Sequence, residues 1–80
     1  MVRCELEYVN AVRSKIGFDV PPIEEEGTMD EENCFAYAGI YLLGDIYVVY
    51  MKDEERVCIE EASTIDEARE VAKRFVKSIC

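Results

Sequence analysis

The clearest pattern of apolar and polar positions lies near the C-terminus. From Ile65 onward, apolar residues recur every three or four positions, which predicts a helix with one buried face. Thr64 and Glu67 have the spacing of a capping box, in which the two side chains cap N–H groups at the helix start. Acidic residues come first and basic residues last, as the helix dipole favours. The pattern therefore predicts a helix from Thr64 to about Ile79.

A different pattern fills the middle of the chain and predicts an antiparallel sheet. Residues 34–61 are rich in Tyr, Val and Ile, which strands favour. Gly44 and Asp45 fit a tight hairpin turn, because Gly readily adopts the positive φ that such turns need. The acidic residues 53–55 fit a second reversal. The predicted strands are 34–43, 46–52 and 56–61.

The hairpin turn fixes which side chains share a face of the sheet. It pairs Leu43 with Ile46, and the alternation of side chains along the strands then assigns the rest. One face holds Tyr37, Tyr41, Leu43, Ile46, Val48, Tyr50, Val57 and Ile59, and the other holds Ala36, Ala38, Ile40, Leu42, Tyr47, Val49, Met51 and Cys58. Both faces are apolar, and a large bare apolar face is unusual on a monomer. We therefore predict a homo-oligomer, a dimer, whose contact face carries Tyr37, Tyr41, Val48 and Tyr50.

Residues 2–16 carry two patterns at once. Apolar residues at helical spacing run through the whole segment, and Gly17 supplies a helix end. Strict alternation from Val2 to Tyr8 fits a strand instead. Because the helical pattern is the longer one, we predict a helix over 2–16, with the strand as the alternative.

Residues 18–33 are predicted to form an acidic loop with room for one short edge strand. Pro21 and Pro22 block a helix, and like charges at high density disfavour compact structure. Exposed carboxylates in such a loop suit a basic partner. The candidate interaction surface consists of Glu24, Glu25, Glu26, Asp30, Glu31, Glu32, Asp53, Glu54 and Glu55.

The chain has four cysteines, which are candidates for disulfides. They form no closely spaced pair and there is no His, so a zinc site is not predicted. A bond between the terminal Cys4 and Cys80 would prevent fraying, but Cys4, Cys34, Cys58 and Cys80 allow three pairings. Cytosolic proteins of hyperthermophiles use disulfides, and a chain with no Gln and many charges has the composition typical of such organisms.

Charge and composition narrow the function. A net charge of −9 repels phosphate and argues against direct binding to nucleic acid. Without His, a Ser or Cys nucleophile lacks its usual base, so no catalytic residue, cofactor or metal site is predicted. The longest apolar run, 34–43, is too short to cross a membrane, and the N-terminus does not resemble a signal peptide. We therefore expect a cytoplasmic, non-enzymatic protein.

Two family resemblances bear on this expectation. The order of helix, three strands and helix resembles the double-stranded RNA-binding domain, but Thr64 and Asp66 stand where that family has a Lys-rich motif, so RNA binding is not implied. Residues 58–68 are similar to the strand-to-helix junction of HicB-type antitoxins, small acidic oligomers that bind a basic toxin. The Pro-Gly motif that precedes this strand in that family is missing here.

The sequence thus predicts one α+β domain over residues 1–80. It has an N-terminal helix, a three-stranded antiparallel sheet with room for a fourth strand, and a C-terminal helix packed on one sheet face. The expected function is protein interaction, with self-association through an apolar sheet face. The alternative is an acidic decoy or inhibitor, a nucleic-acid mimic or antitoxin-like protein, of a basic nucleic-acid-binding partner.

Overall fold

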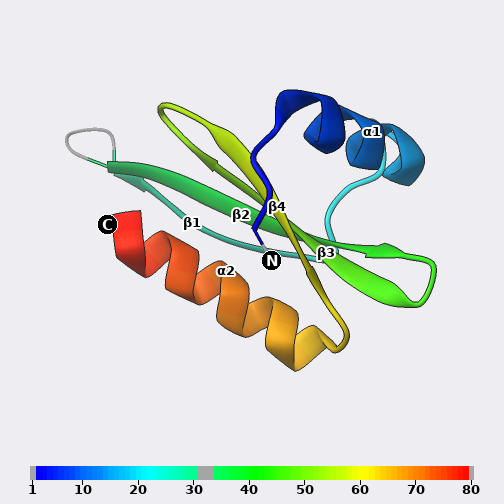
Figure 1. Ribbon diagram of the computed structural model, residues 1–80. Helices are drawn as coiled ribbons and strands as arrows, with labels where there is room; N and C mark the ends of the chain where they lie inside the picture. The colour runs from blue at the N-terminus through cyan, green and yellow to red at the C-terminus, as the bar shows by residue number, and fades with distance from the viewer. Residues whose placement is uncertain (1, 31–33, 80) are drawn as a thin grey trace.

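The computed structural model describes residues 2–30 and 34–79 and shows the predicted α+β fold (Figure 1). A four-stranded antiparallel sheet has one helix on each face. The elements in chain order are α1 (Leu6–Ile16), β1 (Glu24–Asp30), β2 (Cys34–Leu43), β3 (Ile46–Asp53), β4 (Val57–Ala62) and α2 (Ile65–Ile79). In the described part of the chain, no helix is long and apolar enough to cross a membrane.

The sheet is a simple meander with the strand order β1-β2-β3-β4. Its central hairpin has the predicted register, because Leu43 pairs with Ile46 and Tyr41 pairs with Val48. Gly44 has the positive φ that the turn requires. The predicted division of side chains between the two faces follows from this register.

The acidic segment contains the fourth strand for which the sequence left room. β1 pairs with β2 over its whole length, with Glu24 opposite Ile40 and Gly27 opposite Tyr37. Like charges did not prevent this strand, because alternation sends neighbouring carboxylates to opposite faces of the sheet. One of them, Glu24, also meets a basic residue of α2.

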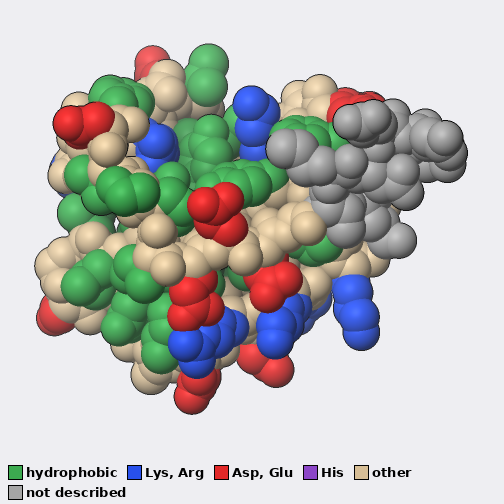
Figure 2. Space-filling model, turned by 180° about the vertical axis from the view of Figure 1, so that it is seen from behind, with side chains coloured by type: hydrophobic (Ala, Val, Ile, Leu, Met, Phe, Trp, Pro, Cys, Tyr) green, Lys and Arg blue, Asp and Glu red, His purple; other side chains and the backbone are tan. Residues whose placement is uncertain are grey.

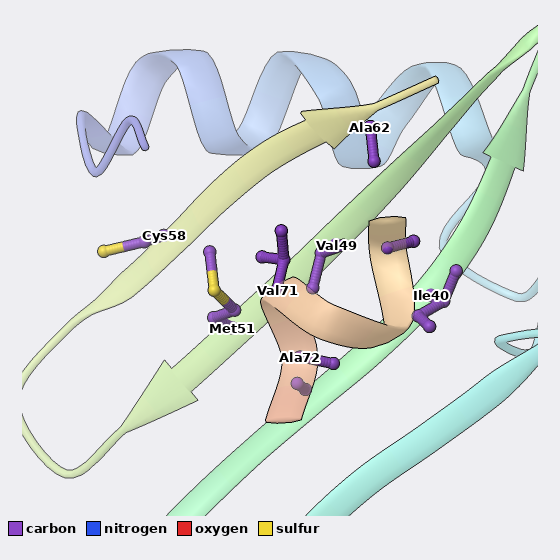
Figure 3. Packing of buried hydrophobic residues seen from close by; sticks show 9 residues of the cluster. Ile40, Val49, Met51, Cys58, Ala62, Val71 and Ala72 are labelled. Atoms are coloured by element: carbon purple, nitrogen blue, oxygen red, sulfur yellow. The ribbon is translucent and has the colours of Figure 1, made fainter. Parts of the chain in front are cut away.

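α2 covers the face that carries Ala38, Val49 and Met51. Figure 3 shows the side chains of Ile40, Val49 and Met51 directed toward Val71 and Ala72 of the helix. Alanines on both layers are fully buried and let the helix approach the strands closely. As predicted, Thr64 Oγ1 accepts a hydrogen bond from the N–H of Glu67 at 3.1 Å. The other half of the predicted capping box differs, because the Glu67 carboxylate accepts a hydrogen bond from the Ser63 hydroxyl at 3.0 Å and not from a backbone N–H.

α1 covers part of the opposite face. Val9 and Val12 of the helix are buried against Val48 and Ile59 of the sheet. The predicted helix is therefore confirmed over Leu6–Ile16, but it does not begin at residue 2. The first residues are extended, and Arg3 forms a β-bridge with Ile59. The strand-like alternation therefore describes the start of the segment, and the helical spacing describes the rest.

The β-bridge is reinforced by a disulfide between Cys4 and Cys58. Arg3 and Ile59 exchange two backbone hydrogen bonds of 2.8 Å, which places Cys4 beside Cys58 with their Cα atoms 4.1 Å apart. This pairing corrects the suggested bond between Cys4 and Cys80. Cys80 lies outside the described residues, as does the side chain of Cys34.

Replacing Cys4 with Ser is expected to lower the free energy of unfolding by about 2–4 kcal/mol, because the disulfide closes a long loop. The two cysteines are 54 positions apart in the sequence. Cys4 is exposed, so the Ser hydroxyl remains in water. Guanidinium unfolding followed by circular dichroism measures the change, and Cys58→Ala serves as the matched variant. An unchanged unfolding midpoint in both variants would contradict the structural role of this bond.

Candidate functional site

The two edges of the sheet differ. At the β4 edge, the N-terminal segment bonds to Ile59 and is held there by the disulfide. At the β1 edge, no described segment pairs with the outer side of the strand. Alternate N–H and C=O groups of an edge strand point away from the sheet and remain free to pair. β1 is therefore the sheet edge at which another chain has room to bind.

A hollow of about 530 Å³ lies beside this edge. Its aromatic side chains, Phe35, Tyr37 and Tyr50, belong to the sheet face that α1 covers only in part. Gly27 stands between Tyr37 and the open edge, so no side chain of β1 separates them. The remaining lining residues are Glu25, Glu26, Ala36 and Lys52. We call this feature the aromatic hollow.

Tyr37 forms the centre of the aromatic hollow. Gly39 makes room for it, because a Cβ atom at Gly39 would lie only 2.7 Å from the Tyr37 hydroxyl. Burial raises the pKa of Tyr37 to about 12, and the nearby Tyr41 and Glu25 act in the same direction. The Tyr37 phenol therefore stays neutral to a higher pH than an ordinary tyrosine.

The side chain of Arg13 extends from α1 over the aromatic residues of the sheet face that α1 covers. Its guanidinium carbon lies 4.8 Å from the ring centre of Tyr41, 5.1 Å from that of Tyr50 and 5.9 Å from that of Phe18. Its Nη1 atom is buried and has no hydrogen-bond acceptor among the described residues. The three aromatic rings attract the guanidinium charge, although this nitrogen has no acceptor among the described residues.

An ion pair fastens the start of β1 to α2. Arg69 Nη2 lies 2.6 Å from Glu24 Oε2, and Arg69 Nε donates to the same carboxylate. This bidentate contact lowers the pKa of Glu24. Arg69 also pairs with Asp66 at 3.1 Å. The ion pair connects the edge strand to α2. Because its carboxylate is already bound to Arg69, Glu24 is not free to bind a partner protein.

The other acidic residues of the predicted interaction surface have different positions. Glu25 and Glu26 lie on β1 beside the aromatic hollow, and Asp30 ends the strand. Glu31 and Glu32 lie outside the described residues. Asp53 shapes the β3–β4 turn, since its Oδ1 accepts hydrogen bonds from the N–H groups of Glu55 and Arg56. These two hydrogen bonds lower the pKa of Asp53. Glu54 and Glu55 are exposed in the same turn.

The four residues of the predicted dimer face are divided by α1. Val48 and Tyr41 are 1% and 5% exposed, so they belong to the core of the single chain. Tyr37 and Tyr50 remain half-buried and line the aromatic hollow. Self-association stays a prediction, but of these four residues only Tyr37 and Tyr50 are accessible to a second copy.

Phe35, Lys52 and Gly27 were not predicted as site residues. The position of Gly27 depends on the pairing of β1 with β2, which the proline-containing segment before β1 did not indicate. Phe35 shares a face with Tyr37 by alternation along β2, and the predicted hairpin register places Lys52 opposite Tyr37, so the sequence did carry a signal for these two residues.

The charged side chains around β1 are unevenly distributed. In the view from behind, acidic side chains lie between an area of hydrophobic side chains and a group of basic ones (Figure 2). The basic residues Lys73, Arg74 and Lys77 of α2 line a second hollow together with Glu26. The α2 side of β1 is therefore of mixed charge. On the α1 side, the exposed Glu25 lies beside aromatic rings and Lys52.

Comparisons with models of protein families, with curated proteins and with solved structures gave no match. Within residues 2–30 and 34–79, no group of three or more carboxylate, Cys or His side chains is placed to hold a metal ion. The open edge and the aromatic hollow are therefore the features of this molecule that bear on its function.

A tyrosinate absorbance titration should show that Tyr37 is among the last of the five tyrosines to ionise, near pH 12. In the unfolded chain the phenol ionises near its ordinary pKa of 10.0. The stability due to burying neutral Tyr37 is thus complete below pH 10 and is lost as the pH rises through about 12. Tyr37→Phe should remove this late step, and a late step that persists unchanged in the variant would refute the assignment.

Proposed function

We propose that this domain is a non-enzymatic protein-interaction module that binds an extended, basic segment of another protein along β1. The observation that carries the proposal is the difference between the two sheet edges. The chain's own N-terminus pairs with the β4 edge at Ile59 and is held there by a disulfide, whereas the β1 edge has no described partner. An exposed edge strand binds extended peptides through main-chain hydrogen bonds.

Charge determines which kind of chain fits this edge. Glu25 and Glu26 form no ion pair within the described part of the molecule, and the whole chain has a net charge of −9. Two copies of β1 side by side would bring their carboxylates together, which disfavours pairing with a second copy. A basic strand would instead gain attraction and faster association. Proteins that bind nucleic acid carry such basic segments.

The two sides of β1 favour a particular order of side chains in the partner. Side chains alternate between the two faces of a strand, so every second partner residue would project over the aromatic hollow and Glu25. The others would project toward α2, where Glu26 lies among the basic residues. The best partner strand therefore alternates basic residues with uncharged ones. The absence of His from the chain further favours binding over acid–base catalysis.

A peptide of alternating Thr and Arg, acetyl-(Thr-Arg)4-amide, tests the proposal by NMR titration. The backbone amide signals of β1 and its neighbour β2 should shift most, and the affinity should fall as salt is added. The matched control is the same peptide with the amides of every second residue methylated in either register. Methylation keeps the charge but removes the N–H donors that pairing requires, so one of these control peptides should bind much more weakly.

Three outcomes would count against strand addition at β1. The first is that the peptide leaves all signals unchanged, and the second is that it shifts the signals of the exposed acids in the β3–β4 turn more than those of β1. The third is that both methylated peptides bind as well as the parent peptide, which would indicate attraction between charges without strand pairing. A shift of equal size with acetyl-(Thr-Glu)4-amide would exclude a requirement for a basic partner.

A further inference from the structure

We propose that the aromatic hollow is a binding site for an arginine side chain, contributed by the basic strand on β1. This inference rests on the proposed function and adds the residue type that the site recognises. Phe35, Tyr37 and Tyr50 supply the aromatic rings, and Glu25 supplies a carboxylate at the rim. A cation over aromatic rings is attracted to their negative faces, and a nearby carboxylate adds a charged hydrogen-bond acceptor.

Arg13 shows that this sheet face already holds a guanidinium group in the same way. It lies among Phe18, Tyr41 and Tyr50, with a buried nitrogen that has no acceptor among the described residues. Arg13 contacts Tyr50 from the side of α1. Phe35 and Tyr37, by contrast, have no described cation over their rings, so they remain available to a cation from outside.

Gly27 provides the route from the edge to the aromatic hollow. It is the partner of Tyr37 on β1 and has no side chain to cover the ring. A residue added opposite Gly27 would lie two strand spacings from Tyr37, about 10 Å. A long side chain such as Arg covers most of that distance and brings its cation within range of the ring, whereas a short one does not. Gly27 is also required by the backbone, because a Cβ atom there would lie 2.8 Å from the carbonyl oxygen of Ala36.

The charges at the rim are unequal in their effect on a bound cation. Glu25 attracts it, whereas Lys52 repels it. Both side chains are exposed, and no ion pair in the described part of the chain joins Lys52 to a carboxylate. The flexible stem of Lys52 lets its ammonium group turn toward water. Removing the Lys52 charge should therefore strengthen arginine binding, and removing the Glu25 charge should weaken it.

The test compares two small probes, N-acetyl-arginine methylamide and its neutral isostere N-acetyl-citrulline methylamide. The aromatic NMR signals of Phe35, Tyr37 and Tyr50 report on binding. The arginine probe should bind on the order of two- to thirtyfold more tightly than the citrulline probe. Tyr37→Phe keeps a ring and should retain this preference, whereas Tyr37→Leu should lose most of it. The β2 and β3 amide signals of each variant show whether it is folded.

Charge variants distinguish the effect of a charge at the aromatic hollow on arginine binding from the effect of the protein's net charge. Glu25→Gln should weaken arginine binding more than Glu7→Gln, which removes the same charge from the exposed first turn of α1. Lys52→Gln should strengthen it more than Lys15→Gln at the other end of α1. Equal effects within either pair would overturn the proposal, as would equal binding of arginine and citrulline.

The same samples distinguish this inference from the proposed function. If acetyl-(Thr-Arg)4-amide shifts the β1 amides but the two small probes bind alike, strand addition stands and the arginine site is refuted. If the arginine probe is preferred but the peptide does not bind along β1, the arginine site stands and strand addition is refuted.

Discussion

A sheet that is apolar on both faces must be covered twice, and this constraint shapes the whole domain. Val48 and Val49 are neighbours on β3 and point to opposite faces, yet both are almost fully buried. Neither helix alone protects them. α2 packs over Val49 with alanines that allow close contact, and α1 packs over Val48 with two valines. The helices therefore stand on opposite sides of the sheet, at the two ends of the chain.

The position of α1 on the second face also determines which segments of the chain lie at the two sheet edges. The segment that leads into α1 must pass the outer side of β4, and it pairs there through Arg3. The disulfide next to this pair fixes the helix to the sheet. The segment that leaves α1 runs to the opposite edge and becomes β1. The β4 edge is thus paired at Ile59 by the chain itself, and the other edge is formed by β1, which among the described elements contacts β2 and α2.

α1 is shorter than α2 and does not cover the whole of the sheet face on which it packs. A cationic side chain and aromatic side chains occupy the rest of that face. Arg13 fills the space next to the helix by stacking on aromatic rings. Beyond it, the aromatic hollow reaches the open edge. This area is polar and aromatic because α1 is too short to cover it. The aromatic rings and the Glu25 carboxylate that stay uncovered there form the proposed arginine site.

Local signals predicted much of the fold. The turn at Gly44 set the register of β2 and β3, and Thr64 marked the start of α2, because both depend on residues close in sequence. The distribution of helices between the faces was not predictable in this way. Whether Val9 packs on Val48 depends on the path of the whole chain, and so does the pairing of Cys4 with Cys58. The acidic residues and two of the aromatic residues of the site were predicted. The β2–β3 register already places Lys52 opposite Tyr37, whereas the position of Glu25 and Gly27 beside these rings required the register of β1.

Amide hydrogen exchange of the free protein tests most directly whether the two sheet edges differ, with the β4 edge paired at Ile59 and the β1 edge open. The N–H group of Ile59 is on the outer side of β4 but donates to the carbonyl oxygen of Arg3 at 2.8 Å. We expect slow exchange at Ile59 and fast exchange at alternate residues of β1. Slow exchange at every residue of β1, or fast exchange at Ile59, would contradict this difference between the edges.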